Sequence, residues 1–205
     1  MTVRPERVSP FVDHSEIRRG AGEVAGGRYE PDWDRLLRWL GAEAIATVSG
    51  MPASALRSGG ASVYVPVSRS VADGALRAWA TTELARVPGV RVVLTEAEGR
   101  PASLCDGCGA CDAASGRCGS GASFTAREAV ADAVRADLLR MSREDVFEWA
   151  VVVSSDARLA PVARLLIARG QNVVHAGFPP RGRELAAACL ASVDLRPHLG
   201  RLGRA

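Results

Sequence analysis

Apolar positions along the chain follow two alternating periods, one typical of β-strands and one typical of α-helices. The strand-like runs, rich in β-branched residues, cover 8–12, 62–67, 90–94, 149–154 and 172–176, the last of which we expect to be the final strand. Segments with apolar residues three or four positions apart cover 33–40, 71–86, 126–141, 159–169 and 184–190. This alternation predicts an α/β fold of three layers, with a central parallel sheet flanked by helices.

Turn and capping residues set the expected boundaries of these elements. Asp32 is placed to cap the helix 33–40, and Thr125 with Glu128 three positions later forms a capping box for the helix 126–141. Pro66 indicates that a ladder ends early in its strand or that the strand lies near a sheet edge. The glycine-rich segment 14–28 is expected to form a loop beside the end of the first strand.

Composition changes this picture little. The 205 residues suit a single domain, 1–205, and 47% hydrophobic residues are enough for a substantial core. A formal charge of +3 permits phosphate binding without arguing for it, although every basic residue is Arg. No apolar run approaches the roughly 20 residues that cross a bilayer, and the N-terminus has no signal-peptide pattern, so we expect a cytoplasmic protein with reduced thiols.

Two of the predicted strands run into an aspartate. Asp13 follows the first strand, and Asp156 follows the strand 149–154 after a Ser-Ser turn. Ligands of an open parallel sheet bind beyond the carboxyl ends of its strands. Two carboxylates at that edge are suited to share Mg²⁺ or Mn²⁺, which prefer oxygen ligands. Asp156 is also placed to cap the helix that follows it.

Asp137 is a third acidic candidate, since it falls within the apolar stripe of the helix 126–141. A buried carboxylate requires a cation, an Arg or several hydrogen-bond donors, because an unpaired buried charge is costly. Two interpretations therefore stay open for Asp137: a share in the same metal ion, or a buried pair with an Arg.

Three segments of this sequence resemble the NYN family of PIN-like nucleases. They are FVDHSEI at 11–17, VVVSSDARLAPVARLLI at 151–167, and RGQNVVHAGFPP at 169–180. The helix 126–139 aligns without gaps with the family's middle helix. The resemblance covers almost the whole chain and implies a PIN-like fold with metal-dependent endonuclease activity on RNA. It implies catalytic carboxylates at Asp13, Asp137 and Asp156, and a hydroxyl at Ser154.

The chain also departs from the family pattern. Ala131 and Arg158 stand where the resemblance implies two further carboxylates, and Glu16 replaces a usual Asn. Loss of two carboxylates weakens divalent-ion binding, whereas Glu16 can restore one ligand and Arg158 can hold a substrate phosphate. The first hypothesis is therefore an RNA endonuclease using Mg²⁺ or Mn²⁺. The second is a catalytically degenerate domain that binds RNA or a partner protein, with a homo-oligomer also open.

Four cysteines make the sharpest local motif, in a predicted insert over 101–122. Cys105, Cys108, Cys111 and Cys118 have the short spacings that let a backbone fold around one tetrahedral zinc ion. An iron–sulfur cluster, free thiols or a redox switch remain as alternatives. Further arginines near the predicted site are candidate contacts to a nucleic-acid backbone: Arg18, Arg19, Arg181 and Arg183.

Overall fold

The protein folds around a central parallel β-sheet, as the sequence predicts. The computed structural model describes residues 4–26, 29–68, 73–97, 111–112 and 117–204, and it describes no side chains at 68, 97, 111–112 and 117–126. In these residues a seven-stranded sheet has the order β4-β3-β1-β7-β8-β9, with β2 paired to β1. Every pair in it is parallel. Two helical layers cover the sheet, so the predicted three-layer α/β class is confirmed.

Each central strand alternates its side chains between two separate cores. In β1, Val8 and Val12 pack on one face of the sheet, whereas Phe11 packs on the other. In β7, Val153 and Val152 divide in the same way. The strands span Glu6–Asp13 (β1), Leu56–Ser58 (β2), Ala61–Ser68 (β3), Val90–Ala97 (β4), Cys111–Asp112 (β5), Arg117–Cys118 (β6), Trp149–Val153 (β7), Asn172–Gly177 (β8) and Ala191–Asp194 (β9).

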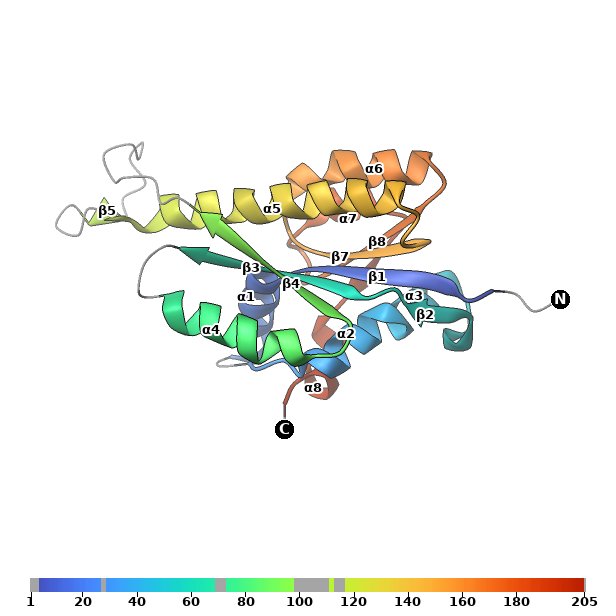
Figure 1. Cartoon of the computed structure of the whole chain (residues 1–205), viewed down its shortest axis with the longest axis horizontal. Helices are drawn as coiled ribbons and strands as arrows, with labels where there is room; N and C mark the ends of the chain where they lie inside the picture. Colours follow the sequence, from blue (N-terminus) through green and yellow to red (C-terminus); the bar gives the residue numbers. More distant parts are fainter. Residues whose placement is uncertain (1–3, 27–28, 69–72, 98–110, 113–116, 205) are drawn as a thin grey trace.

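Helices α5, α6 and α7 lie on one face of the sheet, and α1, α2, α3, α4 and α8 lie on the other (Figure 1). The α-helices span His14–Ala25 (α1), Trp33–Gly41 (α2), Glu43–Ser49 (α3), Gly74–Thr82 (α4), Gly119–Arg143 (α5), Ala160–Ala168 (α6), Arg183–Ala186 (α7) and Leu199–Leu202 (α8). Short 3-10 helices cover Ala53–Ala55, Leu84–Arg86, Ala157–Leu159 and Arg196–His198. Because both faces are covered, the buried residues of the strands between them are predominantly apolar.

The expected loop after the first strand is instead helix α1. Asp13 caps it by accepting hydrogen bonds from the backbone of Ser15 and Glu16. Ile17 and Ala21, four positions apart, are both buried against the sheet. Gly20 lies within this helix, and a side chain is excluded there because a Cβ would come within 2.0 Å of the Phe178 ring. The absence of a side chain at this position allows the helix and the ring to pack closely. The prediction of a loop from the glycine-rich composition is therefore wrong.

Several other boundaries differ from the sequence prediction. Residues 172–176 do not form the final strand, because β9 follows and pairs with β8. Helix α5 begins at Gly119, so Thr125 lies within it and is not its N-cap. Pro66 sits in an interior strand, but β1 pairs with β3 only from Ser62 to Tyr64, so the ladder on that side ends before the proline. None of the helices in the described residues is long and apolar enough to span a bilayer.

Candidate functional site

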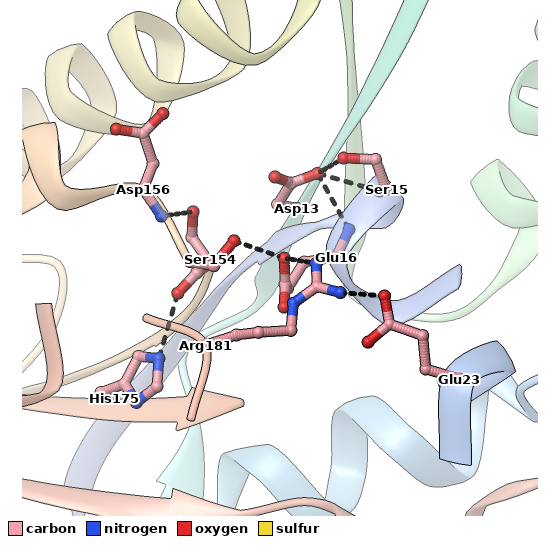
Figure 2. Close-up of polar contacts among 9 residues, drawn as sticks. Asp13, Ser15, Glu16, Glu23, Ser154, Asp156, His175 and Arg181 are labelled. Carbon is pink, nitrogen blue, oxygen red and sulfur yellow. Dashed lines mark hydrogen bonds and ion pairs between the residues drawn. The ribbon is translucent and has the colours of Figure 1, made fainter. Parts of the chain in front are cut away.

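The candidate site lies where strands β1 and β7 end side by side. Their register pairs Val12 with Val153, so Asp13 and Ser154 are the next residues at the same edge. The order of strands in the sheet reverses between β1 and β7, which is the switch point at which open α/β sheets bind ligands. Figure 2 shows Asp13, Glu16, Ser154 and Asp156 gathered at this edge.

Asp13 is 5% exposed, and one of its carboxylate oxygens accepts all the hydrogen bonds that its side chain receives from the described residues. The donors to Oδ1 are the Ser15 amide at 2.8 Å, the Ser15 hydroxyl at 2.6 Å and the Glu16 amide at 3.4 Å. Burial raises the pKa of Asp13 to about 6 against the opposing effect of Ser15, and the charge of Glu16 adds to the rise. Among the described residues no Arg or His forms an ion pair with Asp13, so its second oxygen is available to a ligand.

Glu16 lies beside Asp13 and is only 1% exposed. Its Oε2 atom accepts from Arg181 at 3.0 Å and from the Ser155 hydroxyl at 2.6 Å. Its Oε1 atom is buried and has no hydrogen-bond partner among the described residues. Arg181 also pairs with Glu23 at 2.6 Å, so this predicted phosphate contact is engaged within the protein.

Asp156 is held by Arg158, two positions along the chain. Oδ1 of Asp156 accepts from the Arg158 amide at 2.9 Å, and the guanidinium donates to both carboxylate oxygens, at 3.0 and 2.7 Å. Burial opposes ionisation of Asp156, but these hydrogen bonds hold its pKa below the usual value. Arg158 also contacts Glu128 at 3.2 Å, so it bridges the turn and helix α5.

The structure does not bring Asp137 to the other two aspartates. Its carboxylate accepts from the Tyr64 hydroxyl at 2.8 Å, from Arg140 at 3.1 Å and from Arg91. Burial opposes ionisation, yet these donors lower the pKa of Asp137. No three acidic, His or Cys side chains in the described part of the chain are grouped to hold a metal. The arrangement of Asp137 matches the open alternative of a pair with Arg.

The other predicted contacts are divided between the site and the surface. The Ser154 hydroxyl accepts from the Asp156 amide at 3.2 Å and so shapes the turn. Arg18 and Arg183 are exposed, and Arg19 is half-buried. Among the described residues none of these three forms an ion pair, which leaves their guanidinium groups available to an external anion.

The cysteine prediction falls largely outside the described residues. Cys105 and Cys108 lie outside them, as does most of the insert 101–122. The backbones of Cys111 and Cys118 are described, and they stand opposite each other in the antiparallel pair β5–β6. Zinc binding therefore stays a prediction.

A cluster of aromatic rings next to Asp13 was missed by the sequence analysis. His14, Trp33 and Trp79 line a cavity of about 310 Å³ on the helical face that contains α1, α2 and α4. Burial lowers the pKa of His14 to about 4, with a smaller contribution from Arg18. A larger cavity of about 590 Å³ lies at the opposite edge, beside Glu6 and Asn172, the first residues of β1 and β8. The cavity lined by His14 lies next to Asp13, at the carboxyl edge where open α/β sheets bind ligands.

Comparisons with known proteins bear on the fold alone. No family model matches this sequence, and no curated protein matches it. The crystal structure of a protein of unknown function, VPA0982 from Vibrio parahaemolyticus RIMD 2210633, is similar, with a TM-score of 0.57 and 14% sequence identity. The match covers 95% of this chain and 96% of that chain. The class defined by the fold and the site is a three-layer α/β domain with acidic residues at its switch point.

Proposed function

We propose that this protein is an endoribonuclease dependent on Mg²⁺ or Mn²⁺, of the PIN-like NYN type, with a reduced acidic site. The observation that carries the proposal is the position of Asp13 at the switch point, beside the turn that bears Asp156. A carboxylate buried without a cationic partner costs free energy, and such cost is commonly tolerated where a ligand uses the group. Asp137 is left out of the proposed ligand set, because Tyr64, Arg91 and Arg140 already occupy its oxygens.

The polar atoms at this edge fit a hard cation. In the described part of the chain, one carboxylate oxygen of Asp13 accepts no hydrogen bond, and one buried oxygen of Glu16 has no partner. Mg²⁺ in phosphoryl-transfer sites is held by one or two carboxylates together with waters and substrate phosphates, so a complete protein cage is not required. A divalent cation bound there would stabilise the negative charge that develops on a phosphodiester during hydrolysis.

The chain's own residues would orient the substrate and the acidic groups. Ser15 and the first turn of α1 fix the Asp13 carboxylate, and Ser154 fixes the turn that carries Asp156. Arg158, now paired with Asp156, is placed to donate to a substrate phosphate, because a guanidinium binds two oxygens in one plane. Arg181 performs a supporting role by orienting the Glu16 carboxylate.

Cleavage of single-stranded RNA by the purified full chain tests the proposal. We expect cleavage with Mg²⁺ or Mn²⁺, none with EDTA, and none from Asp13→Asn or Asp156→Asn. Mn²⁺ should raise the Tm of the wild type and leave that of Asp13→Asn unchanged, because only a ligand that binds the native state stabilises it. Asp34→Asn, at an exposed ion pair with Arg38 on α2, is the matched control. Equal cleavage by wild type and Asp13→Asn would refute the assignment.

The second candidate function is an RNA-binding domain without catalysis. The observation that favours it is the neutralisation of two of the acidic groups, Asp156 by Arg158 and Glu16 by Arg181. For this function we expect metal-independent binding of RNA, no cleavage with either cation, and an affinity that Asp13→Asn does not change. Arg158→Ala should then weaken binding, since the guanidinium would be a phosphate contact.

A further inference from the structure

The cavity beside the acidic site is built from three mutually contacting rings. The His14 and Trp33 rings stack with centroids 5.8 Å apart and planes at 22°. Trp79 closes the cluster, with its centroid 5.2 Å from His14 and 6.0 Å from Trp33. The remaining lining residues are Arg18, Glu30, Pro31, Leu76 and Arg204. The cavity of about 310 Å³ is at the small end of ligand sites, which span roughly 300–1,000 Å³.

The rings carry polar atoms that the protein itself does not use. His14 is 6% exposed, and its ring nitrogens make no hydrogen bond with any described residue. The indole N–H groups of Trp33 and Trp79 likewise have no partner in the part of the chain that the structure describes. These three groups line the cavity, so their donors and acceptors are available to a ligand that enters it.

The charges at the cavity rim select the kind of ligand. Arg18 and Arg204 bring two positive charges and Glu30 brings one negative charge. Among the described residues none of the three is in an ion pair, and all are exposed. An aromatic cage for a quaternary ammonium ion needs a neutral or acidic surround, whereas two guanidinium groups repel such a cation. The rim therefore favours a flat ligand that carries an anionic group.

We propose that this aromatic cavity binds one unpaired nucleobase of a single-stranded RNA, with the flanking phosphates contacted by Arg18 and Arg204. Every nucleobase has a π-face that stacks on aromatic side chains, and its edge offers donors and acceptors to His14 and the two indoles. The nucleic-acid identity of the ligand rests on the proposed function. The cavity itself adds a binding site outside the acidic cluster.

The chain connects this base site directly to the acidic edge. His14 follows Asp13, so their Cα atoms are about 3.8 Å apart. Asp13 ends β1 and faces the candidate cation site, and His14 begins α1 and lines the cavity on the face that bears α2 and α4. A nucleotide whose base stacks in the cavity would hold its backbone close to Asp13, which positions one strand without base pairing.

Binding measured without metal tests this site apart from catalysis. A fluorescently labelled oligoribonucleotide is titrated with the full chain in EDTA, and intrinsic tryptophan emission is recorded. We expect Trp79→Ala to weaken binding by roughly five- to 150-fold, the range measured when a stacked aromatic is replaced by Ala, and Trp79→Phe to restore most of it. Trp149→Phe, at the start of β7 on the opposite edge, should bind like wild type. Should Trp79→Ala fail to fold, the exposed substitution Arg18→Glu provides the same test, with a lower affinity expected.

The outcomes separate this site from the proposed nuclease activity. Weakened binding by Trp79→Ala with no cleavage by the wild type supports the base site and removes the nuclease. Cleavage that depends on Asp13, with unchanged binding by Trp79→Ala and Arg18→Glu, supports the nuclease and overturns the base site. Failure to bind any oligoribonucleotide, or binding of a trimethyl-lysine peptide in its place, also overturns the base site.

Discussion

The Nε2 atom of His175 on β8 donates a hydrogen bond to the carbonyl oxygen of Ser154 over 3.0 Å. A carbonyl only accepts, so Nε2 carries the proton, and Nδ1 then accepts from the Ser192 hydroxyl at 2.9 Å. Burial lowers the pKa of His175 and favours this neutral form. Gly182 leaves room for the ring, because a Cβ there would lie 2.9 Å from Nε2. His175 thus anchors the turn that carries Asp156.

Replacing His175 by Ala should destabilise the protein by about 1–3 kcal/mol, because the buried Ser154 carbonyl loses its donor. Denaturant unfolding measures this loss. Ser192→Ala is the control: Ser192 is exposed, and its removal should cost much less. Equal free energies of unfolding for His175→Ala and wild type would contradict the anchoring role.

Asp13→Asn should remove a pH dependence of stability. Burial raises the pKa of Asp13 from 3.8 to about 6, so the folded state binds more protons than the unfolded state between these values. The protonated Asp13 carboxyl therefore contributes its full share to the stability of the wild type below about pH 4, and this stability is lost as pH rises through about 6. The shift corresponds to about 3 kcal/mol. The stability of Asp13→Asn relative to wild type should rise by that order between pH 4 and 7, and a flat difference would contradict the burial of the charge.

Gly20→Ala should destabilise the protein, because the new methyl group would overlap the buried ring of Phe178. A Cβ at Gly20 would lie 2.0 to 2.6 Å from three ring carbons, so either the helix or the ring must move. Overpacking of this kind typically costs about 1–3 kcal/mol. Gly200→Ala in α8 meets nothing within 4 Å and serves as the control, with an unchanged or slightly higher Tm expected.

Gly20 also illustrates why α1 was missed from the sequence. Strong apolar periods identified β1, β7 and α2, whose burial follows from local pattern, and Asp32 caps α2 as predicted. Helix α1 contains two glycines that suggest a loop, and its stability depends on a cap from Asp13 and on contact with Phe178 far along the chain. Such long-range packing overrides local propensity and leaves no local signature.

In the candidate site too, the local sequence pattern predicts some features, whereas others depend on contacts between distant residues. Strand ends predicted that Asp13 and the turn at Asp156 share one edge, because parallel strands align their carboxyl ends. The partners of each carboxylate depend on side chains from other elements, such as Arg91 on β4 for Asp137. The aromatic cavity joins residues of three helices, and only His14, directly after Asp13, offered a sequence signal.

Metal analysis of the purified chain should find one zinc ion per molecule, bound by Cys105, Cys108, Cys111 and Cys118. The backbones of Cys111 and Cys118 are register partners in the antiparallel pair β5–β6, so two of the four predicted ligands lie on adjacent strands. Cys105→Ala should release the metal and lower the Tm, since coordination supplies folding free energy to such segments. Cys189→Ala, at a half-buried free thiol, should retain it. Iron in the analysis with visible absorption would favour the cluster alternative.

Asp137→Asn should lower stability without changing RNA cleavage per folded molecule. The substitution removes the charge that Arg91 and Arg140 contact, while Asn can still accept from Tyr64. Hydrogen bonds to charged groups contribute about 1.5–3 kcal/mol each when well buried, and the half-exposed arginines reduce this, so we expect a loss of about 1–2 kcal/mol. Denaturant unfolding together with cleavage at saturating Mn²⁺ separates the two effects. Loss of cleavage with unchanged stability would indicate that Asp137 is a metal ligand. It would contradict the assignment of Asp137 as a structural partner of Arg91 and Arg140.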